Sequence, residues 1–177
     1  MSMTSRELWT VIHGMGLGAI FLLAFAGGLA GLYSLRPELV TPQGMRERLP
    51  RLISGTWIMA LAAWGTVITG TYIVYPWYRA RPPEGTADLR AYPRSFLLAD
   101  ENLQAWHTFG MEWKEHVAWF SPILAMVVAF IVLRYGAQIA ENPFLRKAVI
   151  VLFVLAFAAA GIAGLFGAFI TKAAPLL

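Results

Sequence analysis

The chain has 177 residues, of which 58% are hydrophobic and 14% charged, and its formal net charge is +4. This balance lies far from that of a soluble globular domain, and the length fits a single domain. The sequence contains no cysteine, which excludes disulfides, zinc–thiolate sites, iron–sulfur ligation and covalently attached c-type haem. The basic residues lie mainly between apolar runs, which is typical of topology signals in membrane proteins and does not indicate nucleic acid.

Four apolar runs, at residues 8–34, 52–75, 117–133 and 148–171, are long enough to cross a bilayer, which takes roughly 17–25 residues of helix. We therefore predict an all-α integral membrane protein in which a single domain, 1–177, forms a four-helix bundle. Its helices are expected at about 8–34, 52–75, 101–134 and 148–171. The third should begin before its apolar run, because Asp100 suits an N-cap and Glu101 suits a first turn.

The first predicted helix begins near Ser5 and contains His13. Its apolar stretch is too long for the core of a secretory signal, about 7–15 residues, so we expect a retained helix. Its small-xxx-small glycine pairs are Gly14/Gly18 and Gly27/Gly31. Such pairs let membrane helices approach closely, and the alternative interpretation is that they make room for a flat macrocycle.

Three connections separate the predicted helices. The first, 36–51, is short and basic, and its prolines at 37, 42 and 50 are expected to stop helices. The second, 76–100, is long and begins with aromatic residues typical of a membrane interface. The third, 135–147, carries the turn signal Asn142-Pro143. Because short basic loops stay inside, we expect both termini and the second connection to face outward from a bacterial-type cytoplasmic membrane.

The segment 106–120, WHTFGMEWKEHVAWF, contains two of the three histidines, His107 and His116. With the expected topology, both lie near the outer surface, at the same level as His13. Threonines at 66–71 and glycines at 161–167 fall in the outer halves of the second and fourth helices. Ionisable groups within a membrane are costly, about 2.5–3.5 kcal/mol for the charged types, and usually mark a functional site.

His107 and His116 are nine residues apart, which at roughly 100° per residue places them on opposite sides of a regular helix. One face of that helix is a stripe with spacings of three and four: Trp106, Phe109, Trp113, His116 and Phe120. Glu112 lies one turn from His116. We therefore predict that His116 points into the bundle and that His107 lies on the other side, with Lys114.

Two buried imidazoles on facing helices, in a chain without cysteine, suit the iron of haem b. The helix count and the placement of His13 and His116 resemble four-helix membrane b-type cytochrome subunits, which pass electrons between quinone and a partner subunit. The resemblance implies haem b near the outer leaflet with His13 and His116 as axial ligands. It also implies a partner redox subunit, such as a c-type cytochrome.

The resemblance is incomplete in its number of ligands. Two-haem members need four histidine ligands, and this chain has three histidines. The departure implies either one haem or a second haem with a ligand such as Met15 or Met111.

Glu112 and its neighbours have several interpretations. Glu112, with His107 or His116, could hydrogen-bond a quinol hydroxyl and take its proton. Alternatively Glu112 and Glu115 are solvated residues of an amphipathic stretch. A metal site of His107, Glu112 and His116 is chemically possible, but their angular spread on one helix makes it poor.

The chain is too short to hold a separate catalytic domain, so we expect a non-catalytic or quinone-reactive subunit of an oxidoreductase complex, surrounded by lipid and other subunits. A cofactor-free structural or assembly subunit is the alternative. A transporter or channel is disfavoured, because the inner halves of the helices offer no polar path.

Overall fold

The computed structural model describes residues 3–174, which form helices and contain no β-strand. Four helices are long and apolar enough to cross a membrane, as the sequence predicted: Ser5–Ser34, Pro42–Tyr78, Trp106–Glu141 and Pro143–Ala173. We call them the first to fourth long helices. Their segments are α1 (Ser5–Val11), η1 (Ile12–Gly16), α2 (Leu17–Ser34), α3 (Pro42–Thr69), η2 (Gly70–Val74), α4 (Tyr75–Tyr78), η3 (Trp106–Met111), η4 (Trp113–Val117), α6 (Phe120–Glu141) and α7 (Pro143–Ala173).

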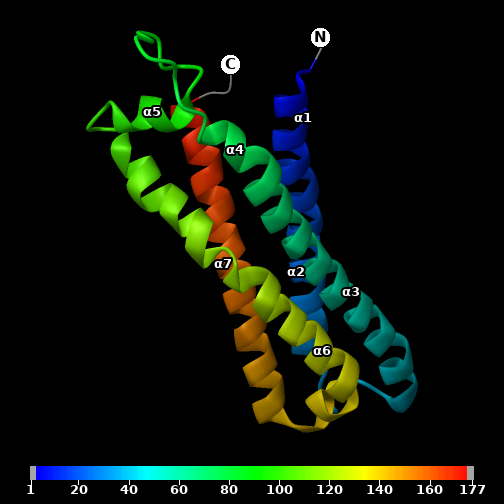
Figure 1. Ribbon diagram of the computed structural model, residues 1–177. Coiled ribbons are helices and arrows are strands. Elements are labelled where there is room, and N and C mark those ends of the chain that lie inside the picture. Colours follow the sequence, from blue (N-terminus) through cyan, green and yellow to red (C-terminus); the bar gives the residue numbers. More distant parts are fainter. Residues whose placement is uncertain (1–2, 175–177) are drawn as a thin grey trace.

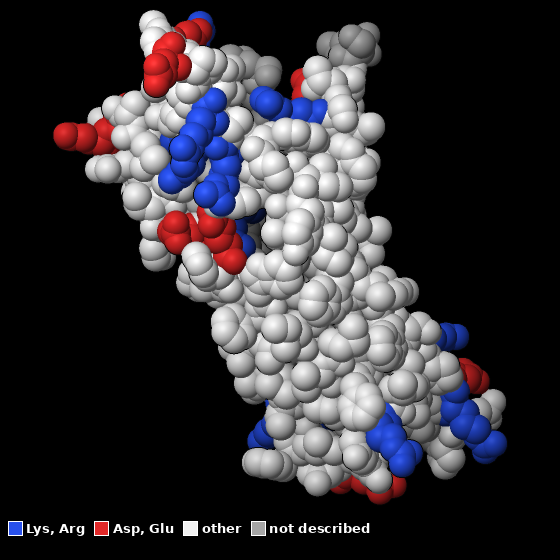
Figure 2. Space-filling view, viewed as in Figure 1, with Lys and Arg blue, Asp and Glu red and all other residues white. Residues whose placement is uncertain are grey.

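The long helices run alternately up and down (Figure 1). The first and last described residues lie at the same end, together with the connection that contains α5 (Pro93–Leu98). We call this end the terminal end. Figure 2 shows charged side chains gathered toward the two ends, with a largely uncharged band between them on the face shown. That distribution suits helices that cross a hydrocarbon layer.

Side-chain caps begin three of the long helices. The Thr4 hydroxyl accepts a hydrogen bond from the Glu7 amide, and the Glu7 carboxylate accepts one from the Thr4 amide, which makes a capping box. The first helix therefore begins at Ser5, as predicted, with Thr4 as its N-cap. Thr41 caps α3, and Asn142 caps α7 by accepting hydrogen bonds from the Phe144 and Leu145 amides. The turn predicted at Asn142-Pro143 is confirmed.

The prolines at 42 and 50 do not stop helices, so the predicted start of the second helix at about 52 is wrong. α3 begins at Pro42, where the fixed φ suits the first helical position and no amide hydrogen is required. The helix then continues through Pro50. The first connection is correspondingly shorter than the expected 36–51.

Two other predicted boundaries also differ. The third long helix begins at Trp106 and not directly after Asp100, whose carbonyl instead closes a separate turn with the amides of Leu103 and Gln104. Within α6 the helix is kinked at Tyr135 (φ −125°, ψ 18°), directly after the predicted end of the third helix at 134. The chain after the kink is helical to Glu141, so the expected connection at 135–147 is largely helical.

The connection between α4 and η3 is anchored by a small cluster of apolar side chains at the terminal end. Leu97 of α5 is fully buried there with Tyr78, Met111 and Ile170. Within the loop, the Asp88 carboxylate accepts hydrogen bonds from the Arg90 side chain and amide, and this contact lowers the pKa of Asp88 to about 2. That carboxylate therefore stays ionised at neutral pH.

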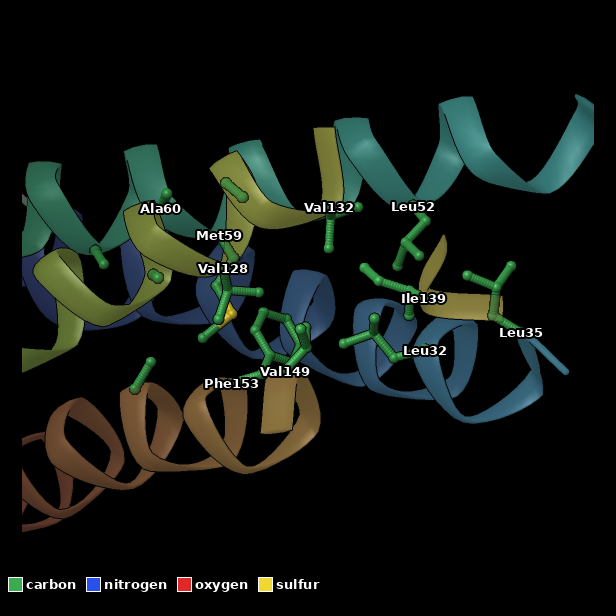
Figure 3. Close-up of a cluster of buried hydrophobic side chains, with 14 of the residues drawn as sticks. Leu32, Leu35, Leu52, Met59, Ala60, Val128, Val132, Ile139, Val149 and Phe153 are labelled. Carbon is green, nitrogen blue, oxygen red and sulfur yellow. The ribbon is translucent and has the colours of Figure 1, made fainter. Parts of the chain in front are cut away.

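The main core lies away from the terminal end and is apolar. Figure 3 shows its centre, where side chains from all four long helices meet: Leu32, Leu35, Leu52, Met59, Ala60, Val128, Val132, Ile139, Val149 and Phe153. Phe153 is fully buried, and a Cβ built on Gly28 would lie 2.7 Å from its Cζ. Because lipid is as apolar as these side chains, close packing of this kind, and not transfer from water, holds membrane helices together.

Replacing Gly28 with leucine should therefore destabilise the bundle, because the new side chain overlaps the Phe153 ring. Overpacking costs about 1–3 kcal/mol, which thermal unfolding in detergent would detect as a lower midpoint. Gly27→Leu is the matched control, because a Cβ at Gly27 meets nothing within 4 Å. Equal midpoints for the two variants would contradict this packing.

Candidate functional site at the terminal end of the bundle

Three of the four long helices contain π-helical turns: η1 in the first, η2 in the second, and η3 and η4 in the third. These turns lie in the parts of the helices nearest the terminal end. A π-turn widens the helix by bonding residue i to residue i+5, is rare, and often occurs at a functional site. Here the turns carry the three histidines and Lys114.

His13 is half-buried in η1, and its hydrogen bond fixes the ring. Its Nδ1 lies 3.2 Å from the Thr69 Oγ1, which itself lies 2.7 Å from the Gly65 carbonyl oxygen. A threonine hydroxyl has one hydrogen, and because that hydrogen goes to a backbone carbonyl of α3, the oxygen accepts from His13. In a neutral imidazole this contact favours the proton on Nδ1 and leaves Nε2 as the ring nitrogen without a proton.

Gly70 gives the imidazole its space. A Cβ built on Gly70 would lie 2.7 Å from the His13 Cε1, closer than real Cβ contacts allow. The first and second long helices thus meet with an aromatic ring of one against the bare backbone of the other. By contrast, Gly14 and Gly18, which the sequence offered as packing glycines, have open space around their Cα atoms.

Lys114 extends from η4 to the fourth long helix. Its Nζ donates a hydrogen bond to the Ala163 carbonyl oxygen at 3.1 Å and lies 2.8 Å from where a Cβ of Gly167 would be. This contact joins the third long helix to the fourth, as the contact of His13 with Thr69 joins the first to the second.

Sequence reasoning missed this role of Lys114, which it placed on the same side as His107. The signal that could have found it is the glycine at 167. A small residue on a facing helix is what a long charged side chain needs in order to enter a bundle.

His107 is buried, with 8% of its surface exposed, and both of its ring nitrogens have partners. Arg94 Nε donates to the His107 Nε2 at 3.4 Å, and because arginine can only donate, Nε2 is the acceptor. Nδ1 then carries the proton and donates to the Tyr78 hydroxyl at 2.9 Å. In this arrangement His107 links α4, α5 and η3.

His116 lies at the surface, with 70% of its side chain exposed. Its Nδ1 is 3.0 Å from the Glu112 carbonyl oxygen and 3.4 Å from the Glu112 carboxylate. No hydrogen bond of its Nε2 occurs among the described residues. His107 and His116 are thus on different sides, as predicted, but the prediction that His116 points inward and His107 outward is wrong.

His107 is buried because Tyr78 of α4 and Arg94 of α5 lie against its ring, and a period along one helix does not predict such contacts. The predicted stripe is kept only in part. The Trp106 ring stacks on Phe169 of α7, with the two ring centroids 5.2 Å apart. The rings of Phe109 and Trp113 lie against Phe166, which is also on α7. After Trp113 the side chains no longer follow the face that packs on α7, and His116 lies at the surface.

The other candidate residues do not converge. Glu112 is half-exposed beside His116, and Met15 is 71% exposed, whereas Met111 is buried. Among the described residues, no group of three histidine, cysteine or acidic side chains is arranged to hold a metal ion. The poor metal site of His107, Glu112 and His116 is therefore not assembled.

Comparison of the chain with protein-family models, with curated proteins and with solved structures finds no match.

The contact of His13 with Gly70 can be tested directly. Gly70→Val should push the imidazole from Thr69, so that the single Nδ1-protonated tautomer is lost. Nitrogen NMR of histidine-labelled protein reports this, and Gly55→Val is the matched control, because a Cβ at Gly55 has open space. An unchanged tautomer in Gly70→Val would contradict the geometry.

Proposed function

We propose that this protein is an integral membrane electron-transfer subunit that binds haem b near the terminal end of its bundle. In this proposal the terminal end faces outward from a bacterial-type cytoplasmic membrane. The four long apolar helices and the charges gathered at the two ends support insertion. Arg146 and Lys147, near the start of α7, support the orientation, because basic residues at the ends of membrane helices favour the cytoplasmic side.

The observation that carries the proposal is the hydrogen bond between the His13 Nδ1 and the Thr69 hydroxyl, which would leave Nε2 to bind a metal. Histidine ligands of metals hold their second ring nitrogen in a hydrogen bond, which fixes the tautomer and the orientation of the ring. The bond from His13 Nδ1 to Thr69 supplies that support. This support favours His13 as one axial ligand of haem b, whose iron would accept and release single electrons.

His116 is the second axial ligand in the proposal, because His107 has partners on both nitrogens. The fit is incomplete on this side. The side chain of His116 lies on the surface of the third long helix and must turn toward the bundle to share an iron with His13. If it does not, the iron has one histidine ligand and an open position.

The proposed redox partners would bind at the terminal end of the bundle. Arg79, Arg81 and Arg94 lie in or beside the connection at the terminal end, where a c-type cytochrome or another redox subunit would dock. A membrane quinol would approach the exposed carboxylate of Glu112, which suits proton transfer. The chain itself would be a quinone-reactive or non-catalytic part of an oxidoreductase complex.

Purified protein should show a reduced-minus-oxidised haem b spectrum that is lost in His13→Ala, because the iron loses its interior ligand. Haem content per chain, measured as the pyridine complex, quantifies the loss. A spectrum unchanged in His13→Ala would exclude this ligand. Wild-type protein without haem, even after haem is added, would instead favour the cofactor-free structural subunit.

The two remaining histidines should behave differently. His116→Ala should retain haem but convert it from a low-spin, six-coordinate form to a high-spin form, visible in the Soret band and by electron paramagnetic resonance. His107→Ala should leave the spin state unchanged and lower the thermal midpoint, since it removes the buried partner of Tyr78 at a cost of about 1–3 kcal/mol. The reverse pattern would make His107 the ligand.

A further inference from the structure

An open groove runs along the exposed side of α2, on the part of that helix that leads to the α2–α3 connection. Its volume is about 570 Å³, within the range of small-molecule sites, about 300–1,000 Å³. Large side chains of α2 line it at spacings of three and four, which places them on one face: Leu22, Phe25, Leu29 and Tyr33. Phe157 of α7 forms the other wall, and its ring stacks on Phe25 with the ring centroids 3.9 Å apart. Apart from the Tyr33 hydroxyl, the lining side chains are apolar, so the groove suits hydrocarbon.

The groove is about as long as one leaflet of a bilayer is deep. Leu22 and Tyr33 are eleven residues apart, which is roughly 16 Å of helix at 1.5 Å per residue. The hydrocarbon core of a bilayer is about 30 Å thick, so one leaflet contributes roughly 15 Å. When Tyr33 lies at the membrane interface, where tyrosine is common, Leu22 lies near the middle of the bilayer. An acyl chain spans the same depth.

A guanidinium group lies at the interface end of the groove. Arg36 follows the end of α2, and its Cζ lies 4.3 Å from the centroid of the Tyr33 ring. Its Nε donates a hydrogen bond to the Tyr33 carbonyl oxygen at 3.0 Å, which holds the group beside the groove. The two terminal nitrogens make no hydrogen bond within the described part of the chain. A pair of such N–H donors suits the oxygens of a phosphate.

The charge of Arg36 is not neutralised by an acidic neighbour. The ion pairs of the described residues lie toward the terminal end of the bundle, so Glu38, two residues after Arg36, forms none with it. Arg146 lies close by but has a different role. Its Nη1 donates to the carbonyl oxygens of Leu35 and Ala140, both at 3.0 Å, and so joins the ends of helices. Arg36 is therefore the arginine that can receive an anion at the groove.

We propose that this groove holds an acyl chain of an anionic phospholipid whose phosphate pairs with Arg36. The lipid comes from the leaflet at the α2–α3 connection, opposite the terminal end (Figure 1), and its binding needs no haem. Ala26 and Ala30, also in the lining, form a small-xxx-small pair that a helix of another chain could use. The phospholipid is the better occupant, because it supplies both hydrocarbon for the groove and an anion for Arg36.

The headgroup contact is tested by a lipid titration of the full-length protein, delipidated in detergent and followed by native mass spectrometry. The probes are phosphatidylglycerol, which is anionic, and phosphatidylcholine, which is zwitterionic. Wild type should bind phosphatidylglycerol roughly fivefold to tenfold more tightly, as expected for one basic residue at a membrane surface. In Arg36→Gln this preference should be lost. Arg48→Gln is the matched control, because it removes an exposed arginine of α3 near the same end, and it should keep the preference.

The acyl-chain contact is tested by filling the groove. Ala30→Phe places a ring in the space that the chain occupies, and both lipids should then bind more weakly than they bind to wild type. Residue 30 is exposed, so the new side chain does not enter the core. Ala19→Phe is the matched control, because Ala19 is exposed on the same helix and does not line the groove. The Arg36 variant provides an independent test if Ala30→Phe folds poorly.

Any of four results would overturn the inference. Equal affinities of wild type for the two lipids, or an unchanged preference in Arg36→Gln, would show that Arg36 does not hold the phosphate. An effect of Arg48→Gln as large as that of Arg36→Gln would make the preference a property of the whole basic end. Unchanged lipid binding by Ala30→Phe would place the acyl chain elsewhere. A wild-type dimer that Ala30→Phe separates would show that a second copy of the chain occupies the groove.

Discussion

The contact between the His13 imidazole and the bare backbone at Gly70 is the constraint on which the polar end of this bundle depends. The ring occupies the volume that any side chain at residue 70 would need. Because the ring lies there, its Nδ1 reaches the Thr69 hydroxyl. The orientation of one imidazole thus follows from the absence of one methyl group on a neighbouring helix.

Different interactions hold the two ends of the bundle together. Toward the α2–α3 and α6–α7 connections, apolar side chains such as Met59 and Phe153 are fully buried and pack closely. At the terminal end, π-turns interrupt three long helices, and polar side chains enter between them. These polar side chains do not stabilise the bundle as apolar packing does, because a buried polar group without a hydrogen bond lowers the stability of the fold. A functional site is the simplest reason for polar side chains in this position.

Much of the fold could be predicted from the sequence, because it rests on local signals. Apolar runs predicted the four long helices, and the Asn142-Pro143 turn was placed correctly because its side-chain cap is a short-range interaction. The predicted start of the second helix at about 52 was wrong, because that helix begins at Pro42. The predicted start of the third, directly after Asp100, was also wrong, because that helix begins at Trp106. In those cases the outcome depends on whether a proline falls at the first helical position and on whether a capped turn continues into the long helix.

The candidate site was less predictable. Periodicity at 100° per residue separated His107 from His116 but assigned the wrong one to the interior, because Tyr78 and Arg94 of other segments cover His107. The contribution of Lys114 depends on Gly167, a residue in another helix. Contacts between helices of this kind leave no pattern within one segment, whereas the shared level of the three histidines did suggest a site at this end.

The most direct test of the account is the visible spectrum of the full-length protein purified from membranes, recorded before and after reduction by dithionite. The account predicts haem b bands that respond to reduction, at a stoichiometry of about one haem per chain, set by a single interior ligand at His13. Protein that is folded, monodisperse and colourless, and remains so when haem is supplied, would contradict it.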